Sequence, residues 1–248
     1  MSVTLAYDLH LHSCLSPCSD ADMTPGHIAG MAALCGLRVV ALTDHNTVMN
    51  SPSFLRFAAQ AGLIALPAME LTTREEVHIL CLFAAQDAAL AFSEVVYARL
   101  PDIPNNEAIY GPQVLIGADG RPLGHEPRLL LSAADIGTQE VSALVGSYGG
   151  LAVPAHIDRP SFSLLANLGS YDPAMDFPLM ELSPQADEPA VRRAHPELDG
   201  TRFIRNSDAH SLAGICDAAN VLTVEKATPA GVLEALRSLH KIGSNEKY

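Results

Sequence analysis

The sequence predicts an α/β protein with a mostly parallel sheet, and three observations support this fold class. Short β-rich runs alternate with helical stretches of roughly 10–15 residues along most of the chain. The 248 residues are 48% hydrophobic and 17% charged, which is enough apolar material for one large core. Histidine and acidic residues gather where strands are predicted to end, at the edge where α/β proteins place their active sites. The alternation fits a closed barrel and an open doubly wound sheet equally well.

Eight segments have the composition and length of strands. They span 4–12, 38–45, 64–71, 77–83, 151–156, 179–183, 202–208 and 221–224. Signals for helix starts and stops lie between them. These signals predict helices from Thr24-Pro25 to Gly36, from Thr138 toward Gly149, and from Pro229 toward His240.

The segment 101–135 breaks this rhythm. It is rich in proline, and 113–123 has the pattern of a hairpin around Asp119-Gly120. A connection of this length without a helix is usually functional or a small insertion. We therefore predict a single domain over 1–248, in which 101–135 is an irregular insertion beside the site with a lid as its candidate role.

The charge balance restricts the classes of partner. Fifteen basic residues stand against 28 acidic ones, which gives a net charge of −13. This balance argues against tracking of long nucleic acid and against binding to an acidic membrane, but bound cations could still attract a small anion. We find no secretory signal and no apolar spanning stretch, and five cysteines are an odd number for a disulfide framework. We expect a cytoplasmic protein.

Residues able to bind metals occur at the ends of six predicted strands. They are His10 with His12, Asp44 with His45, Glu70, His78, His156, and Asp208 with His210. His10 and His12 would share one face of a strand, with Cα atoms about 7 Å apart, which allows both to bind one metal. Asp8 would lie on the same face and could orient one of these histidines.

Glu70 follows the apolar run 64–69, where a buried and unpaired carboxylate would be costly. A cation is the simplest partner, since the first lysine of the chain is Lys226. Each motif alone could be a satisfied core histidine or a surface turn, but six together predict a polynuclear metal site. Imidazole and carboxylate ligands suit Zn²⁺, Mn²⁺ or Fe²⁺.

The ordered combination of these motifs resembles the PHP (polymerase and histidinol phosphatase) domain family over nearly the whole chain except 101–135. The matching motifs are His10-Leu-His12, Leu42-Thr-Asp-His45 with Glu70, His156 in Pro-Ala-His-Ile-Asp, and Ser207-Asp-Ala-His210. The resemblance implies a distorted (β/α)7 barrel of TIM-like type. It also implies two or three divalent metal ions, of Zn, Mn or Fe, at the C-terminal ends of the strands.

The same resemblance implies a set of ligands. The first metal would be held by His10, His12, Glu70 and Asp208, the second by Glu70, His78 and His156, and the third by His45, His210 and one further residue. The spacing after His12 is longer than is usual in the family. Aligning Ser19-Asp20 and Thr24-Pro25 with the family selects Asp20 for this last ligand, while Asp22 and Cys18 stay open as alternatives.

The implied function is metal-dependent hydrolysis of a small phosphomonoester, with a nucleotide or nucleoside bisphosphate as a candidate, by attack of a metal-bridged hydroxide. Glu70 and Asp208 would act through the metals, and Arg159 would clamp the phosphate, with Arg74 as a weaker alternative. An oligonucleotide or phosphodiester nuclease, a histidinol phosphatase and a non-catalytic metal-stabilised module stay open. An amide hydrolase is disfavoured, because such enzymes commonly use a bridging lysine and the early half of this chain has none.

Overall fold

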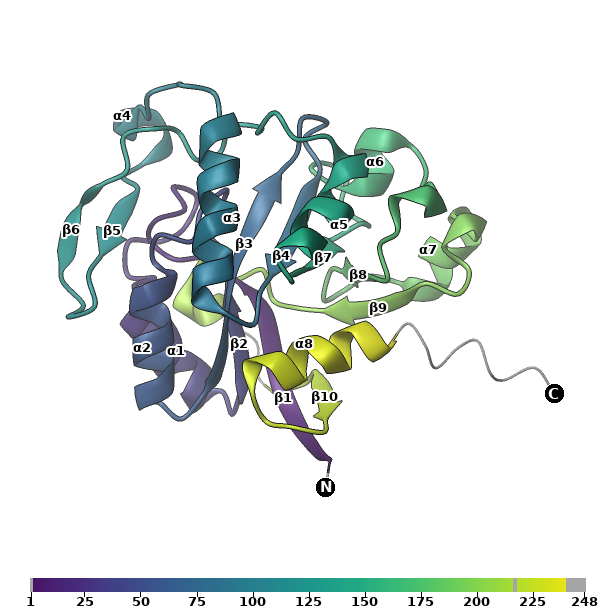
Figure 1. The fold of residues 1–248 in the computed structure, drawn as a ribbon, viewed down its shortest axis with the longest axis horizontal. Helices are drawn as coiled ribbons and strands as arrows, with labels where there is room; N and C mark the ends of the chain where they lie inside the picture. Colours follow the sequence, from purple (N-terminus) through teal and green to yellow (C-terminus); the bar gives the residue numbers. More distant parts are fainter. Residues whose placement is uncertain (1, 216–217, 240–248) are drawn as a thin grey trace.

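The computed structural model describes residues 2–215 and 218–239. Its main unit is a curled six-stranded sheet in the order β10-β1-β2-β3-β4-β7 (Figure 1). These strands are β1 (Val3–Leu11), β2 (Val39–Leu42), β3 (Ile64–Thr72), β4 (His78–Leu82), β7 (Leu151–Pro154) and β10 (Val221–Val224). A parallel pair, β8 (Leu179–Leu182) and β9 (Arg202–Arg205), continues the curl beside β7. All eight predicted strands are therefore confirmed, and most of them are shorter than predicted.

The strand directions differ from the prediction of a mostly parallel sheet. Within the six-stranded sheet only the β1–β2 and β2–β3 pairs are parallel. Residues 73–77 join β3 to β4, and this link is too short for the crossover that a parallel pair needs, so the two strands form an antiparallel hairpin. β7 is antiparallel to β4, and β10 is antiparallel to β1. As a result β1, β2, β3 and β7 run in one direction, while β4 and β10 run in the other.

Hydrogen bonds along the two outer edges of the β8–β9 pair, one facing β7 and one facing β1, close the curled sheet into a distorted barrel. On the β7 side, the amide of Ile157 donates to the carbonyl of Glu181 over 2.9 Å. On the β1 side, the amide of His12 donates to the carbonyl of Ala209 over 3.0 Å, and the amide of Leu9 donates to Oδ1 of Asn206 over 2.8 Å. The barrel that the family resemblance implies is therefore confirmed, with a seam between β9 and β1.

The interior of the barrel explains where the functional side chains point. One buried cluster takes residues from each of these eight strands, so it fills the inside of the curl. Because side chains alternate along a strand, every second residue of β3 points into the barrel, and Glu70 follows Leu66 and Ala68 in this pattern. On β8, Glu181 follows Leu179 in the same way. On both strands the inward-facing side chains are therefore apolar up to a glutamate, and the two glutamates lie at the same end of the barrel.

Strand β1 departs from strict alternation. Leu5, Tyr7 and Leu9 all belong to the inner cluster, which would turn His10 outward. The pairing of β1 with β2 shifts register between Asp8 and Leu11, and such an irregularity redirects side chains. His10 is consequently buried inside the barrel end.

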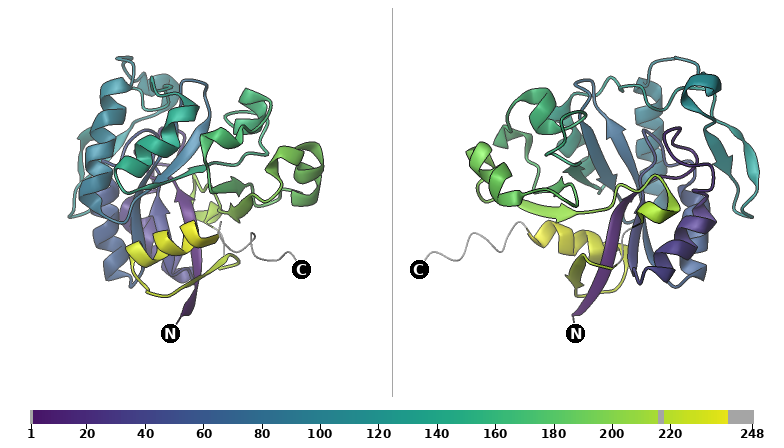
Figure 2. Two further views of the ribbon diagram at one scale, coloured as in Figure 1. Left: turned by 45° about the vertical axis from the view of Figure 1, so that its right-hand side comes forward. Right: turned by 180° about the vertical axis from the view of Figure 1, so that it is seen from behind.

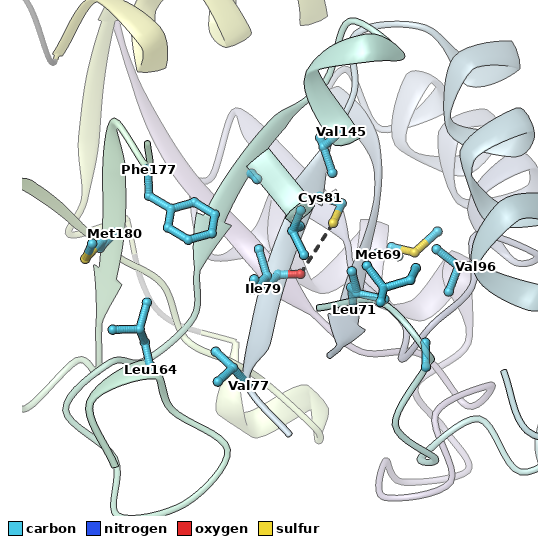
Figure 3. Close-up of a cluster of buried hydrophobic side chains, with 14 of the residues drawn as sticks. Met69, Leu71, Val77, Ile79, Cys81, Val96, Val145, Leu164, Phe177 and Met180 are labelled. Atoms are coloured by element: carbon cyan, nitrogen blue, oxygen red, sulfur yellow. Dashed lines mark hydrogen bonds between the residues drawn. The ribbon is translucent and has the colours of Figure 1, made fainter. Parts of the chain in front are cut away.

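Helices cover the outside of the barrel (Figure 2). They are α1 (Pro25–Leu34), α2 (Ser51–Gln60), α3 (Gln86–Arg99), α4 (Glu107–Tyr110), α5 (Thr138–Ser147), α6 (Leu164–Leu168), α7 (Glu188–Ala194) and α8 (Pro229–Ser238). One outer cluster joins α1 and α2 to β2, and another joins α3 and α5 to β3 and β4. Figure 3 shows part of the outer cluster around α3 and α5. It labels Met69 and Leu71 from β3, Ile79 and Cys81 from β4, and Val96 from α3. α8 packs its Val232, Leu233 and Leu236 against the inner cluster.

The helix signals in the sequence are confirmed with one correction. Thr24 caps α1, since its side chain accepts from the amide of His27, and Pro229 begins α8. Thr138, however, is the first residue of α5 and does not cap it. The carboxylate of Glu75 accepts from the amide and the hydroxyl of Thr138, both over 2.8 Å, and so supplies the cap from another loop. His240 lies outside the described residues.

The segment 101–135 forms α4 and the hairpin of β5 (Val114–Ile116) and β6 (Pro122–His125), which stands beside α2 in Figure 1. The predicted turn is present, with Gly120 at φ +83°. The short helix α4 was not predicted. The amide of Val114 donates to the carbonyl of Cys14, so the segment contacts the loop that follows β1.

None of the helices in the described ranges has the length and apolar character that crossing a membrane would need.

Candidate metal centre

The predicted ligands meet at one end of the barrel. Five strands deliver them there by their C-terminal ends, namely β1 (His10, His12), β2 (His45), β3 (Glu70), β7 (His156) and β9 (Asp208, His210). His78 is an exception to the prediction that all ligands lie at C-terminal ends, because it is the first residue of β4. Since β4 runs opposite to β3, its beginning lies at the same edge.

The carboxylate of Glu70 is the centre of this group and is buried, with 1% of its surface exposed. Its two oxygens face five imidazoles. Oε1 lies 2.9 Å from Nδ1 of His78 and 3.2 Å from Nε2 of both His10 and His156, while Oε2 lies 3.1 Å from Nδ1 of His45 and 3.4 Å from Nε2 of His12. No other described carboxylate contacts so many of the predicted ligands.

Asp208 supplies a second carboxylate to the same point. Its Oδ1 lies 3.1 Å from Nε2 of His10 and 3.2 Å from Nε2 of His12, and these two nitrogens are 3.1 Å apart. Its Oδ2 accepts a hydrogen bond from Nη1 of Arg159 over 2.5 Å. Asp208 therefore connects the histidines of β1 to a guanidinium group.

Neighbouring groups fix the tautomers of His10 and His12. Nδ1 of His10 lies 3.1 Å from both oxygens of Glu181, which can only accept, so this nitrogen carries the hydrogen. The hydroxyl of Ser16 donates to Asp44 over 2.7 Å, so its oxygen accepts from Nδ1 of His12 over 3.2 Å. In both rings Nε2 is left with a lone pair that faces the carboxylates.

When His10 and His12 are neutral, the centre brings lone pairs together without protons between them. Nε2 of His10 and Nε2 of His12 lie 3.1 Å apart and 3.1 to 3.2 Å from Oδ1 of Asp208. Glu70 presents Oε1 to His10 over 3.2 Å and Oε2 to His12 over 3.4 Å. Ligands of a single tetrahedral Zn²⁺ are separated by about the same distance. The residues present thus fit a divalent cation.

The electrostatics of the site support the same conclusion. Burial favours the neutral acid of Glu70, but His78 and His10 outweigh this and hold its pKa well below the usual range. Burial lowers the pKa of His10, but Asp208, Glu181 and Glu70 raise it further and leave it well above its ordinary value. His45 responds in the opposite way, since burial and the neighbouring His12 lower its pKa well below the ordinary value. Charged carboxylates are thus kept in a buried site that positive charge must balance.

Within the described residues, three groups of side chains bring ligand atoms within 4.8 Å of one another. They are His10, His12 and Asp208; His45, Glu70 and His78; and His12, His45 and His210. His156 joins the same region through Glu70. All of the predicted metal ligands except Asp20 therefore lie at one site.

The structure does not bring Asp20 into this site. Its side chain is exposed, and its backbone amide donates to the carbonyl of His210 over 2.8 Å. Asp22 is exposed as well. Sγ of Cys18, the other alternative, lies 3.2 Å from Nε2 of His45 and lines the site cavity. The extra residues after His12 are used for turns in which Ser16 and Ser19 donate backbone bonds, so the family spacing does not carry over.

Sequence reasoning also misassigned the group that orients His10. Asp8 does not contact the imidazole, because its Oδ1 accepts from the backbone amides of His10 and Ser207. Glu181 has this role, and it was missed. The sequence did contain a signal for this residue. Glu181 is a carboxylate within the apolar strand Leu179–Leu182, just as Glu70 is a carboxylate within an apolar strand.

The site opens into a cavity of about 310 Å³. Arg159, Leu131, Ser161 and Phe162 line it together with Cys18 and the predicted ligands other than His10, His12 and Asp20. Arg74, the weaker phosphate candidate, does not line it. Its exposed guanidinium group pairs with Asp135 over 2.7 Å.

Strained backbone accumulates around this cavity. Of the six described non-glycine residues with positive φ, four adjoin the site, namely Asn46, His156, Phe162 and Asp208. Phe162 has φ +53°, its side chain is exposed, and its ring stacks on His78 with centroids 4.9 Å apart. Such conformations cost of order 1–3 kcal/mol and concentrate at functional sites.

Comparison with known proteins agrees with this geometry. The model of the PHP domain matches residues 8–156, which is more than half of the chain. No curated protein matches the chain at a significant level.

Several solved structures have a similar fold. The lesion-specific endonuclease PfuEndoQ from Pyrococcus furiosus superposes with a TM-score of 0.67 and 20% identity, over 98% of this chain and 57% of that chain. A complex of Endonuclease Q with a 27-mer duplex that carries an abasic lesion gives 0.66 and 20%, over 98% and 58%. A protein from Bifidobacterium adolescentis, described as a metal-dependent phosphoesterase, gives 0.58 and 19%, over 92% and 96%. The chain thus spans less than two thirds of the endonuclease structures.

Proposed function

Because the chain belongs to the PHP domain family and is a metal-dependent hydrolase, we propose that it hydrolyses a small phosphomonoester. A nucleotide or a nucleoside bisphosphate is the candidate substrate. Two or three divalent ions, of Zn²⁺, Mn²⁺ or Fe²⁺, are proposed as its cofactors.

The observation that supports this proposal most directly is the convergence of the imidazoles of His10 and His12 with the carboxylates of Glu70 and Asp208. Divalent ions held by these groups would supply a Lewis acid for phosphoryl oxygens and lower the pKa of a water molecule. The surrounding residues prepare the ligands for this task. Glu181 holds the hydrogen of His10 on Nδ1, and Ser16 does the same for His12.

Arg159 is proposed to bind the phosphate. Its side chain is 40% exposed and lines the cavity, and one of its N–H groups donates to Asp208. Its other N–H groups make no hydrogen bond within the described part of the chain. They could therefore donate to two phosphate oxygens in the fork geometry that arginine favours.

The size of the site favours a small substrate. Its volume of about 310 Å³ is at the lower end of the range for ligand pockets. A second cavity of about 390 Å³ shares Arg159 and is lined mainly by apolar residues of α6 and α7 and the chain near them, among them Leu165, Val191 and Ala194. The organic part of an ester could lie there while its phosphate meets the metal centre.

A phosphodiester nuclease is the second candidate, favoured by the likeness to the endonuclease Q structures. The expectation against long nucleic acid rested on the net charge of −13. A similar fold bound to duplex DNA is reason to test that expectation directly.

The test is hydrolysis of a substrate panel by protein loaded with Zn²⁺ or Mn²⁺. The panel contains nucleoside monophosphates and bisphosphates, aliphatic phosphomonoesters, oligonucleotides and a duplex with an abasic lesion. We expect phosphate release from a nucleotide monoester, its loss with a chelator, and its return with added metal. Cleavage of the nucleic acids without release from any monoester would replace this proposal with the nuclease.

Glu70→Ala is the matched inactive variant. It removes the carboxylate that faces five imidazoles, so we expect no turnover and an unchanged circular dichroism spectrum. Full turnover by metal-loaded Glu70→Ala would refute the assignment of this centre as the site of hydrolysis.

A further inference from the structure

We propose that the thiolate of Cys18 is a ligand of the ion that His45 and His210 hold, and that this sulfur biases the centre toward Zn²⁺ over Mn²⁺. The inference rests on the proposed function and specifies one ligand of the same site. The family resemblance implies an acidic residue or histidine at this place, so a sulfur ligand would be a property of this chain.

The position of the sulfur is that of a ligand. Sγ of Cys18 lies 3.2 Å from Nε2 of His45, and the two side chains line the same cavity as His210. With metal–sulfur and metal–nitrogen bonds of about 2.3 and 2.0 Å, a sulfur and a nitrogen on one tetrahedral ion lie about 3.5 Å apart. The spacing of this sulfur and nitrogen therefore fits two ligands of one ion.

Buried polar atoms of the neighbouring ligands point to cations in the same cluster. Nδ1 of His45 is the ring nitrogen that faces Glu70, and Oδ1 of Asp208 faces His10 and His12. The side chain of His45 is 5% exposed, and its Nδ1 has no hydrogen-bond partner among the described residues. Oδ1 of Asp208 is buried and also lacks a hydrogen-bond donor there. Buried groups of this kind ordinarily have a partner, and a bound cation would supply it.

The tautomer of His210 leaves one of its ring nitrogens free to bind the same ion. Its Nδ1 lies 2.9 Å from the carbonyl oxygen of Asp208, which can only accept, so Nδ1 carries the hydrogen and Nε2 is left to coordinate. Its ring stacks on His12 with centroids 4.3 Å apart. Cys18 would be the third protein ligand of this ion beside the imidazoles of His45 and His210.

The loop that carries Cys18 is fixed on both sides of the residue. Before it, the hydroxyl of Ser16 accepts from the amide of His45 and donates to Asp44. After it, the amide of Asp20 donates to the carbonyl of His210. The loop is thus attached to the two histidines that would share the ion with the sulfur.

Sulfur chemistry gives the metal preference. When the sulfur–metal bond forms, the thiol loses its proton to solvent, because metals bind the thiolate. Thiolates favour Zn²⁺ and Co²⁺, whereas Mn²⁺ favours oxygen ligands. Cys18→Ser should therefore weaken Zn²⁺ binding by roughly tenfold or more, while Mn²⁺ binding changes much less.

Co²⁺ titration of the metal-free protein tests the bond directly. We expect a near-ultraviolet sulfur-to-cobalt charge-transfer band in the unaltered chain and in Cys35→Ser, which changes a cysteine at the end of α1. In Cys18→Ser the band should be lost, while the weaker visible bands from the remaining ligands persist.

Alkylation of the unaltered chain avoids any dependence on a variant. Iodoacetamide should modify the exposed Cys18 slowly, because desolvation and the nearby Glu70 raise the pKa of its thiol, and peptide mass spectrometry would follow the rate. With Zn²⁺ at about 100 times its Kd, this rate should fall roughly 100-fold, because only the metal-free fraction reacts. The rate at Cys35 should not change.

Two negative results are distinguishable. Visible cobalt bands without the charge-transfer band, together with unchanged alkylation of Cys18, would overturn this inference and leave the metal centre in place. Absence of any cobalt or zinc binding would overturn the proposed function itself.

Discussion

Both carboxylate oxygens of Glu181 lie 3.1 Å from Nδ1 of His10, at the ring nitrogen opposite the one that faces Glu70 and Asp208. The amide of Asn206 donates to one of these oxygens over 2.8 Å and holds the carboxylate in place. Glu181 thus orients His10 without touching the space that a substrate would enter.

The first prediction concerns this carboxylate. Glu181→Gln removes the charge that holds the hydrogen on Nδ1, so the affinity for Zn²⁺ should fall roughly 10–100-fold. Competition with a chromophoric chelator measures this affinity, and Glu94→Gln on the exposed face of α3 is the control. Equal affinities in the two variants would show that Glu181 does not orient His10.

The second prediction concerns Arg159. Arg159→Met removes the guanidinium group proposed to bind phosphate, so kcat/KM should fall roughly 10–100-fold, mainly through a higher KM. Arg74→Met is the matched control, because Arg74 pairs with Asp135 outside the cavity and its loss should leave both constants unchanged. Steady-state kinetics on the preferred monoester decide between the two outcomes.

The third prediction concerns Phe162. Its exposed ring beside the centre would stack on a nucleobase, so Phe162→Gly should lower kcat/KM for a nucleotide roughly tenfold and spare an aliphatic phosphoester. Relief of the positive φ should offset the lost contact with His78 and keep the free energy of unfolding within about 1 kcal/mol.

Asp176→Gly is the control for Phe162→Gly, since Asp176 has φ +54° but does not line the site cavity. It should keep full activity toward both substrates. Equal losses for the nucleotide and the aliphatic ester in Phe162→Gly would contradict a stacking role.

The fourth prediction concerns the cap of α5. Burial raises the pKa of Glu75, but the hydrogen bonds from Thr138 lower it more, so the folded-state pKa lies below the usual value. A carboxylate with a lowered folded-state pKa stabilises the protein above its unfolded-state pKa, and this contribution is lost as the pH falls through the folded value.

Glu75→Ala should therefore cost about 1 kcal/mol near neutral pH, and the cost should shrink as the carboxylate protonates. Urea unfolding between about pH 7 and about pH 4 measures the difference from the unaltered chain. Glu140→Ala, which removes an exposed carboxylate from the same helix, should show a smaller and flatter difference. A cost for Glu75→Ala that does not depend on pH would assign the effect to lost packing.

The strands, and most of the side chains that gather at the candidate metal centre, could be predicted because their signals are local. Apolar runs end in His10, His45, Glu70 and His156, and strands that end at one barrel edge bring such residues together. The direction of β4 relative to β3 could not be predicted from the alternation of apolar and polar residues, because this pattern is the same for a parallel and an antiparallel strand. Only the short link 73–77 indicates that His78 begins its strand at this edge.

The remaining errors come from contacts between distant segments. Asp20 and Asp8 were selected by spacing and by strict alternation, but turns after His12 and a register shift in β1 override both. Glu181 acts on a histidine 171 positions away, and Glu75 caps a helix 63 positions away. The sequence can mark Glu181 as a carboxylate in an apolar strand, but it does not show which distant residue either glutamate contacts.

The seam between β9 and β1 has a consequence for the order of assembly. The bond between Leu9 and Asn206 joins residues 197 positions apart, and closing so long a loop is among the slowest events of folding. His10 and His12 stand on one side of this seam, and Asp208 and His210 on the other. During synthesis the emerging chain therefore holds an incomplete set of the proposed ligands until β9 and the residues after it are made, and we expect the proposed hydrolysis to begin only after the barrel has closed.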